Sequence, residues 1–125
     1  MQKNKDIDKA AIIRAVITTI ESEKEPQLFE TRYTGKYGTP EKIKLKDGNR
    51  EFIPDLAVHY DAQVDLYEIE LEDKIDVEKW RQMALYAKNL KGHLFLVVPD
   101  YLCEKLKNKI KTSEINMGLI YFNTG

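Results

Sequence analysis

The chain has 125 residues, of which 42% are hydrophobic and 33% charged, and its formal net charge is −1. This composition predicts one ordered domain over 1–125, and a net charge so close to zero excludes overall electrostatic attraction to nucleic acid. A single cysteine, Cys103, excludes an internal disulfide and a cysteine-based zinc site. Because no apolar run reaches the ~18 residues of a membrane span and no signal peptide opens the chain, we expect a cytoplasmic protein without membrane contact.

The first predicted elements are a helix and a hairpin. Apolar residues recur at helical spacing over 10–22, with Asp8 as a suitable N-cap and Pro26 as a stop. After a loop, the alternating segment 42–46 predicts a strand, and the "DGNR" sequence that follows predicts a tight turn. The turn leads into a second strand over 51–60.

The rest of the chain alternates between strands and helices. A third strand is predicted over 65–71, followed by a helix from Asp76 to Gly92, a strand over 93–98, a helix over 99–111 and a last strand over 118–122. The crossover helix requires parallel strands on either side of it. The prediction is therefore an α/β fold with a mixed sheet flanked by helices, in the order αβββαβαβ.

Charge is unevenly distributed along the chain. The segment from Asp55 to Glu78 holds nine acidic residues and one basic residue. By contrast, Arg32–Arg50 holds six basic and two acidic residues, and Lys105–Lys111 adds a second basic stretch. An acidic centre flanked by basic segments suits a metal site that acts on a polyanion. The alternative is that these segments are ordinary solvated faces.

Strand alternation places the central carboxylates on one face of the sheet. Asp55 falls on one face of the second strand, and Glu68 and Glu70 fall on one face of the third. Pairing Leu56 with Ile69 puts the apolar residues together and sets Asp55 opposite Glu70. Carboxylates so close repel one another and lose hydration when buried, so a positive charge is needed between them.

The first hairpin is predicted to bring lysines to the same face. With its turn at 48–49, Lys42, Lys44 and Lys46 share the face of Asp55 across three adjacent strands. Such a surface can hold a divalent cation through carboxylate oxygens and contact a phosphate. The alternative is an exposed polar face with Lys–Glu pairs.

These residues resemble the PD-(D/E)XK nuclease superfamily. The signature is "PD" at Pro54–Asp55 followed by "YEIE" at Tyr67–Glu70. Gln82 and Tyr86 on the following helix resemble the Gln-x-x-x-Tyr motif of the RecB-like branch. The resemblance covers most of the chain, from about residue 8 to 122, and it implies a single nuclease-like domain with a restriction-endonuclease-like core.

The resemblance also implies roles for these residues. Asp55 and Glu68, with Glu70 beside them, would bind Mg²⁺ or Mn²⁺, and Gln82 and Tyr86 would position the substrate or the metal-site side chains. Some members draw a further acid from the first helix, which leaves a choice here between Glu21 and Glu23.

The sequence departs from the family at one position, because Glu70 stands where the motif has lysine. The alternation of side chains along the strands favours Lys44 or Lys42 as the replacement for the motif lysine. Lys79 on the helix is another candidate. A shifted alignment onto "EDK" at 72–74 would restore the acid–x–Lys pattern, but it puts an acid at the apolar middle position.

Two functions follow from the resemblance. The first is a metal-dependent nuclease that hydrolyses DNA, with RNA left open as a substrate and a homodimer or a partner protein as the source of specificity. The second is a catalytically inactive module on the same fold that binds nucleic acid or protein.

Overall fold

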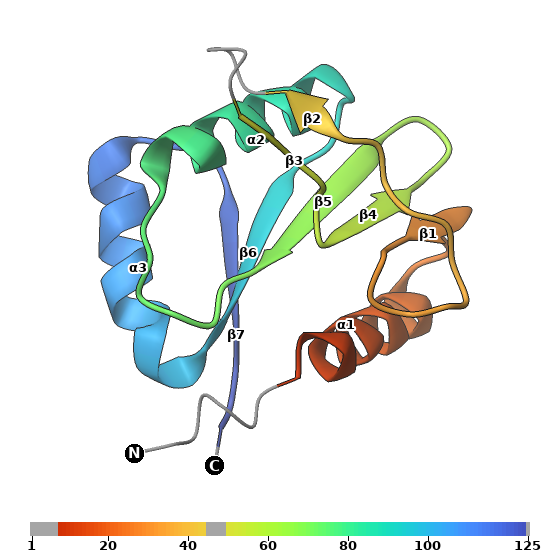
Figure 1. The fold of residues 1–125 in the computed structure, drawn as a ribbon, viewed down its shortest axis with the longest axis horizontal. Helices are drawn as coiled ribbons and strands as arrows, with labels where there is room; N and C mark the ends of the chain where they lie inside the picture. Colours follow the sequence, from red (N-terminus) through yellow and green to blue (C-terminus); the bar gives the residue numbers. More distant parts are fainter. Residues whose placement is uncertain (1–7, 45–49, 125) are drawn as a thin grey trace.

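The computed structural model describes residues 8–44 and 50–124, which form an α/β fold. The described residues contain three helices, a mixed five-stranded sheet and a separate two-stranded hairpin, and they form no closed barrel (Figure 1). In chain order the elements are α1 (Lys9–Glu23), β1 (Leu28–Glu30), β2 (Ile43–Lys44), β3 (Glu51–Phe52), β4 (Leu56–His59), β5 (Val64–Ile69), α2 (Val77–Asn89), β6 (Leu94–Pro99), α3 (Asp100–Ser113) and β7 (Gly118–Phe122).

The sheet has the strand order β1-β4-β5-β6-β7. Its first three strands pair antiparallel, whereas β5, β6 and β7 pair parallel. Parallel strands require a crossover, and α2 and α3 provide the two crossovers. The predicted alternation of helices and strands in the second half of the chain is therefore confirmed. None of the helices in the described part combines the length and apolar character that a membrane crossing needs.

Helix α1 covers one face of the sheet, and α2 and α3 cover the other (Figure 1). The spacing of the buried residues of α1 explains its position, since Ile13, Ile17 and Ile20 form one stripe. This stripe packs on the apolar side chains of the central strands: Leu56, Val58, Tyr67, Ile69 and Val97. The predicted apolar face of the second and third strands is thus correct.

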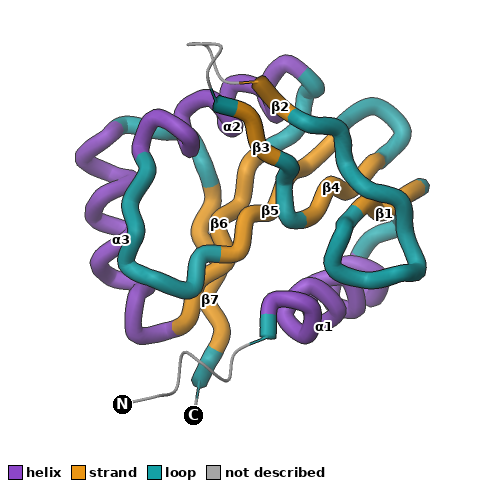
Figure 2. The backbone as a smooth tube through the Cα atoms, in the orientation of Figure 1, coloured by secondary structure: helices purple, strands orange, loops and turns teal. Residues whose placement is uncertain are grey.

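The opposite face carries small apolar side chains under α2 and the hairpin. Met83 and Ala87 of α2 pack on Ala57, Leu66 and Leu94 of the sheet. Residue Ile43 of β2 is buried in the same cluster, and Figure 2 shows the hairpin lying beside α2 rather than in line with the sheet. The hairpin therefore packs against this face of the sheet, beside α2.

Three predicted features of the first half are wrong. The hairpin forms its own sheet, so it does not supply the strand beside β4. That place is taken by β1, a three-residue strand too short to show alternation in the sequence. The predicted second strand is divided into β3 and β4, because Pro54 lies in the middle and has no N–H to donate to a ladder.

Replacing Gly92 by alanine is expected to destabilise the fold by about 2–3 kcal/mol, in the range of an overpacked core substitution. A Cβ at Gly92 would lie 1.8 Å from the Val64 carbonyl oxygen, which is backbone and cannot turn aside. The measurement is the free energy of unfolding in urea. The matched control is Gly35→Ala, since a Cβ there meets nothing within 4 Å. A loss no greater in the Gly92 variant than in the control would contradict this packing.

Candidate active site

The backbone and side chain of Asp55 are both fixed at the start of β4. Its carboxylate Oδ2 accepts a hydrogen bond of 2.7 Å from the Ile69 N–H, and its own N–H donates to Glu68 Oε1 at 3.1 Å. The Thr31 hydroxyl donates to the Asp55 carbonyl oxygen at 2.6 Å. Since Asp55 is only 2% exposed, these bonds replace the water that its charge has lost.

Strand register brings Asp55 directly opposite Glu68. Leu56 pairs with Tyr67, whereas the sequence predicted a pairing with Ile69. The predicted register is therefore wrong by two residues. A shift of two preserves which side chains share a face, but it replaces Glu70 with Glu68 as the partner of Asp55. The two carboxylates consequently lie closer together than predicted.

Two lysines offset the charges of these carboxylates. Lys79 Nζ lies 2.8 Å from Glu68 Oε2, and Lys9 Nζ lies 3.2 Å from Asp55 Oδ2. Lys79 belongs to the first turn of α2 and Lys9 is the first residue of α1, so helices from opposite faces of the sheet each contribute one cation. The repulsion expected between neighbouring buried acids is thereby balanced within the protein itself.

The titration of the site reflects this balance. Burial raises the pKa of Glu68, the negative charge of Asp55 raises it further, and Lys79 opposes both effects. Burial alone would lower the pKa of Lys9, but its interactions with Asp55, Tyr33 and Glu68 together outweigh burial and the net shift is upward. The folded protein therefore holds Glu68 less favourably in its charged form than water does.

Replacing Glu68 by glutamine is expected to raise the free energy of unfolding at pH 7 in the absence of metal. Because the pKa of Glu68 is raised in the folded state, the folded protein binds a proton more tightly than the unfolded chain above the normal glutamate pKa of about 4.3. The stability of the parent protein thus increases as the pH falls through the raised pKa of Glu68. The difference in stability between the Glu68→Gln variant and the parent should therefore shrink as the pH approaches that pKa. Urea denaturation between pH 4.5 and 7 measures this.

The matched control for this substitution is Glu72→Gln, because Glu72 is exposed on the chain just after β5. Its free energy of unfolding should differ from that of the parent by no more than about 0.5 kcal/mol, as for a surface substitution. A Glu68→Gln variant less stable than the parent at pH 7 would contradict the direction of the shift.

Asp55 and Glu68 line a cavity of about 430 Å³. Four cationic side chains share its wall: Lys9, Arg32, Lys42 and Lys79. The ammonium group of Lys79 also lies 5.2 Å from the centre of the Phe52 ring, which forms part of the same wall. A cavity with two buried acids at its base and cations around them is complementary to an anion bound together with a metal ion.

Glu70 lies one residue beyond the end of β5 and does not line this cavity, although it interacts electrostatically with Lys79, Lys9 and Glu68. Its N–H donates to the Val97 carbonyl oxygen at 2.9 Å, and burial raises the pKa of its carboxyl. Within residues 8–44 and 50–124, no three His, Cys, Asp or Glu side chains group closely enough to hold a metal ion. The arrangement is therefore a pair, Asp55 and Glu68, rather than a cluster of three acids.

The lysines of the predicted hairpin are placed differently from the prediction. Lys44 is exposed and does not line the cavity. Lys42 does line it, and its Nζ lies 3.1 Å from Glu51 Oε1. Lys46 lies outside the described residues. Of the two described lysines, only Lys42 therefore lines the cavity of Asp55, and the hairpin forms a separate sheet instead of extending the sheet of β4.

Gln82 and Tyr86 lie on α2 but not on the wall of this cavity. Gln82 Nε2 donates to Glu78 Oε2 at 2.9 Å, one helical turn earlier. Tyr86 lines a second cavity that Ala57 also lines, and its pKa is raised by burial and then by the negative charge of Glu41. Gln82 thus stabilises its own helix in this structure.

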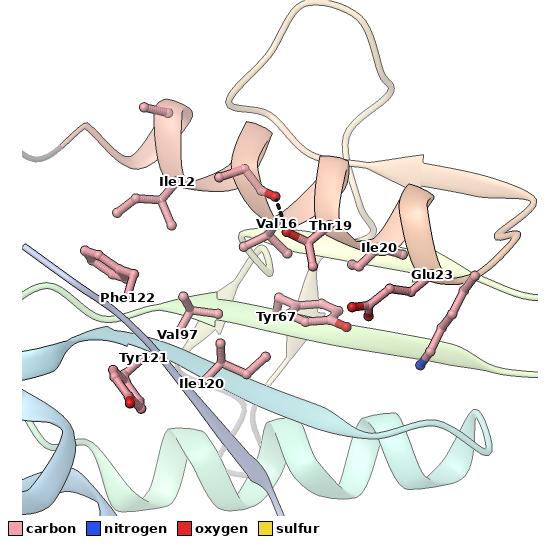
Figure 3. Close-up of a pocket in the computed structure, with 13 residues that line it drawn as sticks. Ile12, Val16, Thr19, Ile20, Glu23, Tyr67, Val97, Ile120, Tyr121 and Phe122 are labelled. Atoms are coloured by element: carbon pink, nitrogen blue, oxygen red, sulfur yellow. Dashed lines mark hydrogen bonds between the residues drawn. The ribbon is translucent and has the colours of Figure 1, made fainter.

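Sequence reasoning missed Lys9 and Arg32 as residues of this cavity. A cation at the first residue of a helix opposes the helix dipole, so Lys9 was a detectable sign of an acidic partner. Glu21 and Glu23 lie at the other end of α1, roughly 18–21 Å along the axis from Lys9. Glu23 lines an apolar groove between α1 and β7 (Figure 3), away from Asp55.

The pair of carboxylates fits a divalent cation such as Mg²⁺ or Mn²⁺. Mg²⁺ is commonly held by one or two carboxylates, with water and substrate phosphate oxygens completing its shell. Asp55 and Glu68 provide the two carboxylates at an open cavity. The lysine side chains that now contact their oxygens are 32% and 26% exposed, so their ammonium groups can turn towards solvent or substrate.

Comparisons of the chain with protein-family models, with curated proteins and with solved structures gave no match. A functional assignment therefore rests on two things: the motif residues quoted from the sequence, and the contacts made by Asp55, Glu68, Lys9 and Lys79.

Proposed function

We propose that the protein is a metal-dependent nuclease that hydrolyses phosphodiester bonds in DNA, built on a restriction-endonuclease-like core. The observation that carries the proposal is the pairing of two buried carboxylates, Asp55 and Glu68, on neighbouring strands. Lys79 beside them takes the part that the motif lysine has in the family, because its Nζ contacts Glu68 directly.

Each residue of the pair has a defined part in this proposal. Asp55 and Glu68 would hold the Mg²⁺ or Mn²⁺ ion, Asp55 with its orientation set by the Ile69 N–H. The ion, when bound, would activate a water molecule and offset the charge of the phosphate. Lys79 would donate a hydrogen bond to a phosphate oxygen whose negative charge grows in the transition state.

The remaining cations of the cavity serve the substrate backbone. Lys9, Arg32 and Lys42 surround the acidic pair, and each can contact a phosphate flanking the scissile bond. Such contacts are independent of base sequence and weaken as salt concentration rises. This explains how a chain with a net charge of −1 could bind a polyanion.

The test is cleavage of supercoiled plasmid, single-stranded DNA and RNA by the purified protein in Mg²⁺, Mn²⁺ or EDTA. We expect DNA cleavage with metal and none in EDTA. Asp55→Asn should abolish it, whereas the matched control Asp61→Asn, at an exposed position, should retain it. Absence of cleavage on every substrate with both metals would overturn the proposal.

One observation favours a second candidate, an inactive module that binds nucleic acid through the same cavity. Both carboxylates are already paired with lysines, so the site is electrically balanced without a metal. Such a module would bind DNA equally well in Mg²⁺ and in EDTA, and Asp55→Asn would leave that affinity unchanged or increase it. Metal-dependent cleavage excludes this candidate.

A further inference from the structure

A second cavity, of about 320 Å³, lies on the same face of the sheet as the acidic pair. Pro40, Pro54 and Leu66 contribute apolar walls. Its polar side chains are Glu30, Glu41, His59 and Tyr86. A partly open space of this size, with apolar walls and a few polar groups, is typical of a small-molecule site.

The second cavity adjoins the first through β4. Asp55 lines the first cavity, while its neighbours Pro54 and Ala57 line the second. Asp55 and Ala57 point to the same face of the strand and are two residues apart, which corresponds to ~6.6 Å. A nucleotide whose phosphate lies at Asp55 can therefore place its base in the second cavity, because a single sugar connects the two.

The polar groups of the second cavity are mainly acceptors. Glu30 Oε1 lies 2.6 Å from His59 Nε2, and Glu41 adds to burial in raising the pKa of the Tyr86 hydroxyl. Each carboxylate retains lone pairs for further donors. Among the described residues that line this cavity there is no lysine or arginine, so it repels phosphate.

The hydrogen-bonding edges of the bases then decide which base fits. Guanine presents two adjacent donors, N1–H and the N2 amino group, which match the two oxygens of one carboxylate. Thymine presents a single N–H between two carbonyl oxygens, and a carboxylate repels both. The exposed carboxylate of Glu41 is accessible to such an edge, and the ring of Tyr86 lies beside it.

We infer that the second cavity binds the guanine base of a nucleotide whose phosphate occupies the Asp55–Glu68 site, with Glu41 accepting hydrogen bonds from the guanine edge. This inference rests on the proposed function and extends it, because it assigns a base preference next to the scissile phosphate.

The test measures binding without cleavage. The ¹⁵N-labelled protein is titrated with dGMP, dAMP, dCMP and dTMP in Mg²⁺ and followed by NMR, since none of these monophosphates contains a phosphodiester bond to cleave. We expect dGMP to bind about tenfold or more tightly than dTMP, as for a bidentate base contact. The amide signals of Ala57 and Tyr86 should move, and Glu41→Gln should reduce the affinity for dGMP to that for dTMP. The control Glu104→Gln, exposed on α3, should leave the preference intact.

The outcomes separate this inference from the proposed function. Equal affinity for the four nucleotides, or a guanine preference that survives Glu41→Gln, overturns the guanine site even if the protein cleaves DNA. A guanine preference that depends on Glu41 supports the site, and it does so even in a protein that cleaves nothing. Binding of N-acetylarginine amide at Ala57 and Tyr86, with no response to dGMP, would identify a site for cationic side chains and overturn the inference.

Discussion

Replacing Lys79 by methionine is expected to reduce the rate of metal-dependent DNA cleavage about 10²–10³-fold, the effect of removing one preorganised group that stabilises transition-state charge. Lys79 Nζ lies 2.8 Å from Glu68 Oε2 and forms an ion pair with that carboxylate. Methionine preserves the length of the side chain over the Phe52 ring while removing the charge. Single-turnover cleavage of a labelled oligonucleotide measures the effect.

The matched control is Lys44→Met. Strand alternation in the sequence had favoured Lys44 as a replacement for the motif lysine. Lys44 is exposed and does not line the cavity, so its variant should cleave at the parent rate. The melting temperature of the Lys79 variant should be measured alongside, to verify that the fold is intact. A large loss in the Lys44 variant with none in the Lys79 variant would mean that the wrong lysine has been assigned.

Adding Mg²⁺ or Mn²⁺ at a hundred times its Kd is expected to stabilise the protein by about 2.7 kcal/mol, as for any ligand that binds only the folded state. The stabilisation should disappear in Asp55→Asn, which retains the shape of the side chain but not its charge. Urea denaturation with and without metal measures it.

The control for the metal effect is Asp61→Asn, which should keep the full stabilisation because Asp61 lies on the exposed turn between β4 and β5. Ca²⁺ provides a second comparison, since it accepts more ligands and longer bonds than Mg²⁺. Equal stabilisation of the parent and Asp55→Asn would place any bound metal elsewhere on the protein.

The sequence alone predicted which side chains share a face, because alternation along a strand has a fixed period of two. Asp55 and Glu68 were placed together for that reason, and so was the apolar face that packs on α1. Register was not determined by the same argument. A shift of two residues leaves every face unchanged, so the pairing of Asp55 with Glu68 rather than Glu70 emerged only from the structure.

The origin of the cations could not be predicted for a different reason. Lys9 and Asp55 are 46 residues apart in the chain, and their contact depends on how α1 docks against the sheet. The pairing of β2 with β3 is likewise local, but the position of the hairpin beside α2 is decided by the burial of Ile43 among residues of other elements. Local patterns specify elements, whereas these contacts are tertiary.

The measurement that tests the central claim most directly is the number of Mn²⁺ ions bound per chain, determined by electron paramagnetic resonance in the absence of DNA. If Asp55 and Glu68 form a cation site, the parent should bind Mn²⁺ with a defined stoichiometry, and Asp55→Asn and Glu68→Gln should each lose that binding while Asp61→Asn retains it. Failure of the parent to bind Mn²⁺, or equal binding by the parent and both site variants, would contradict the account.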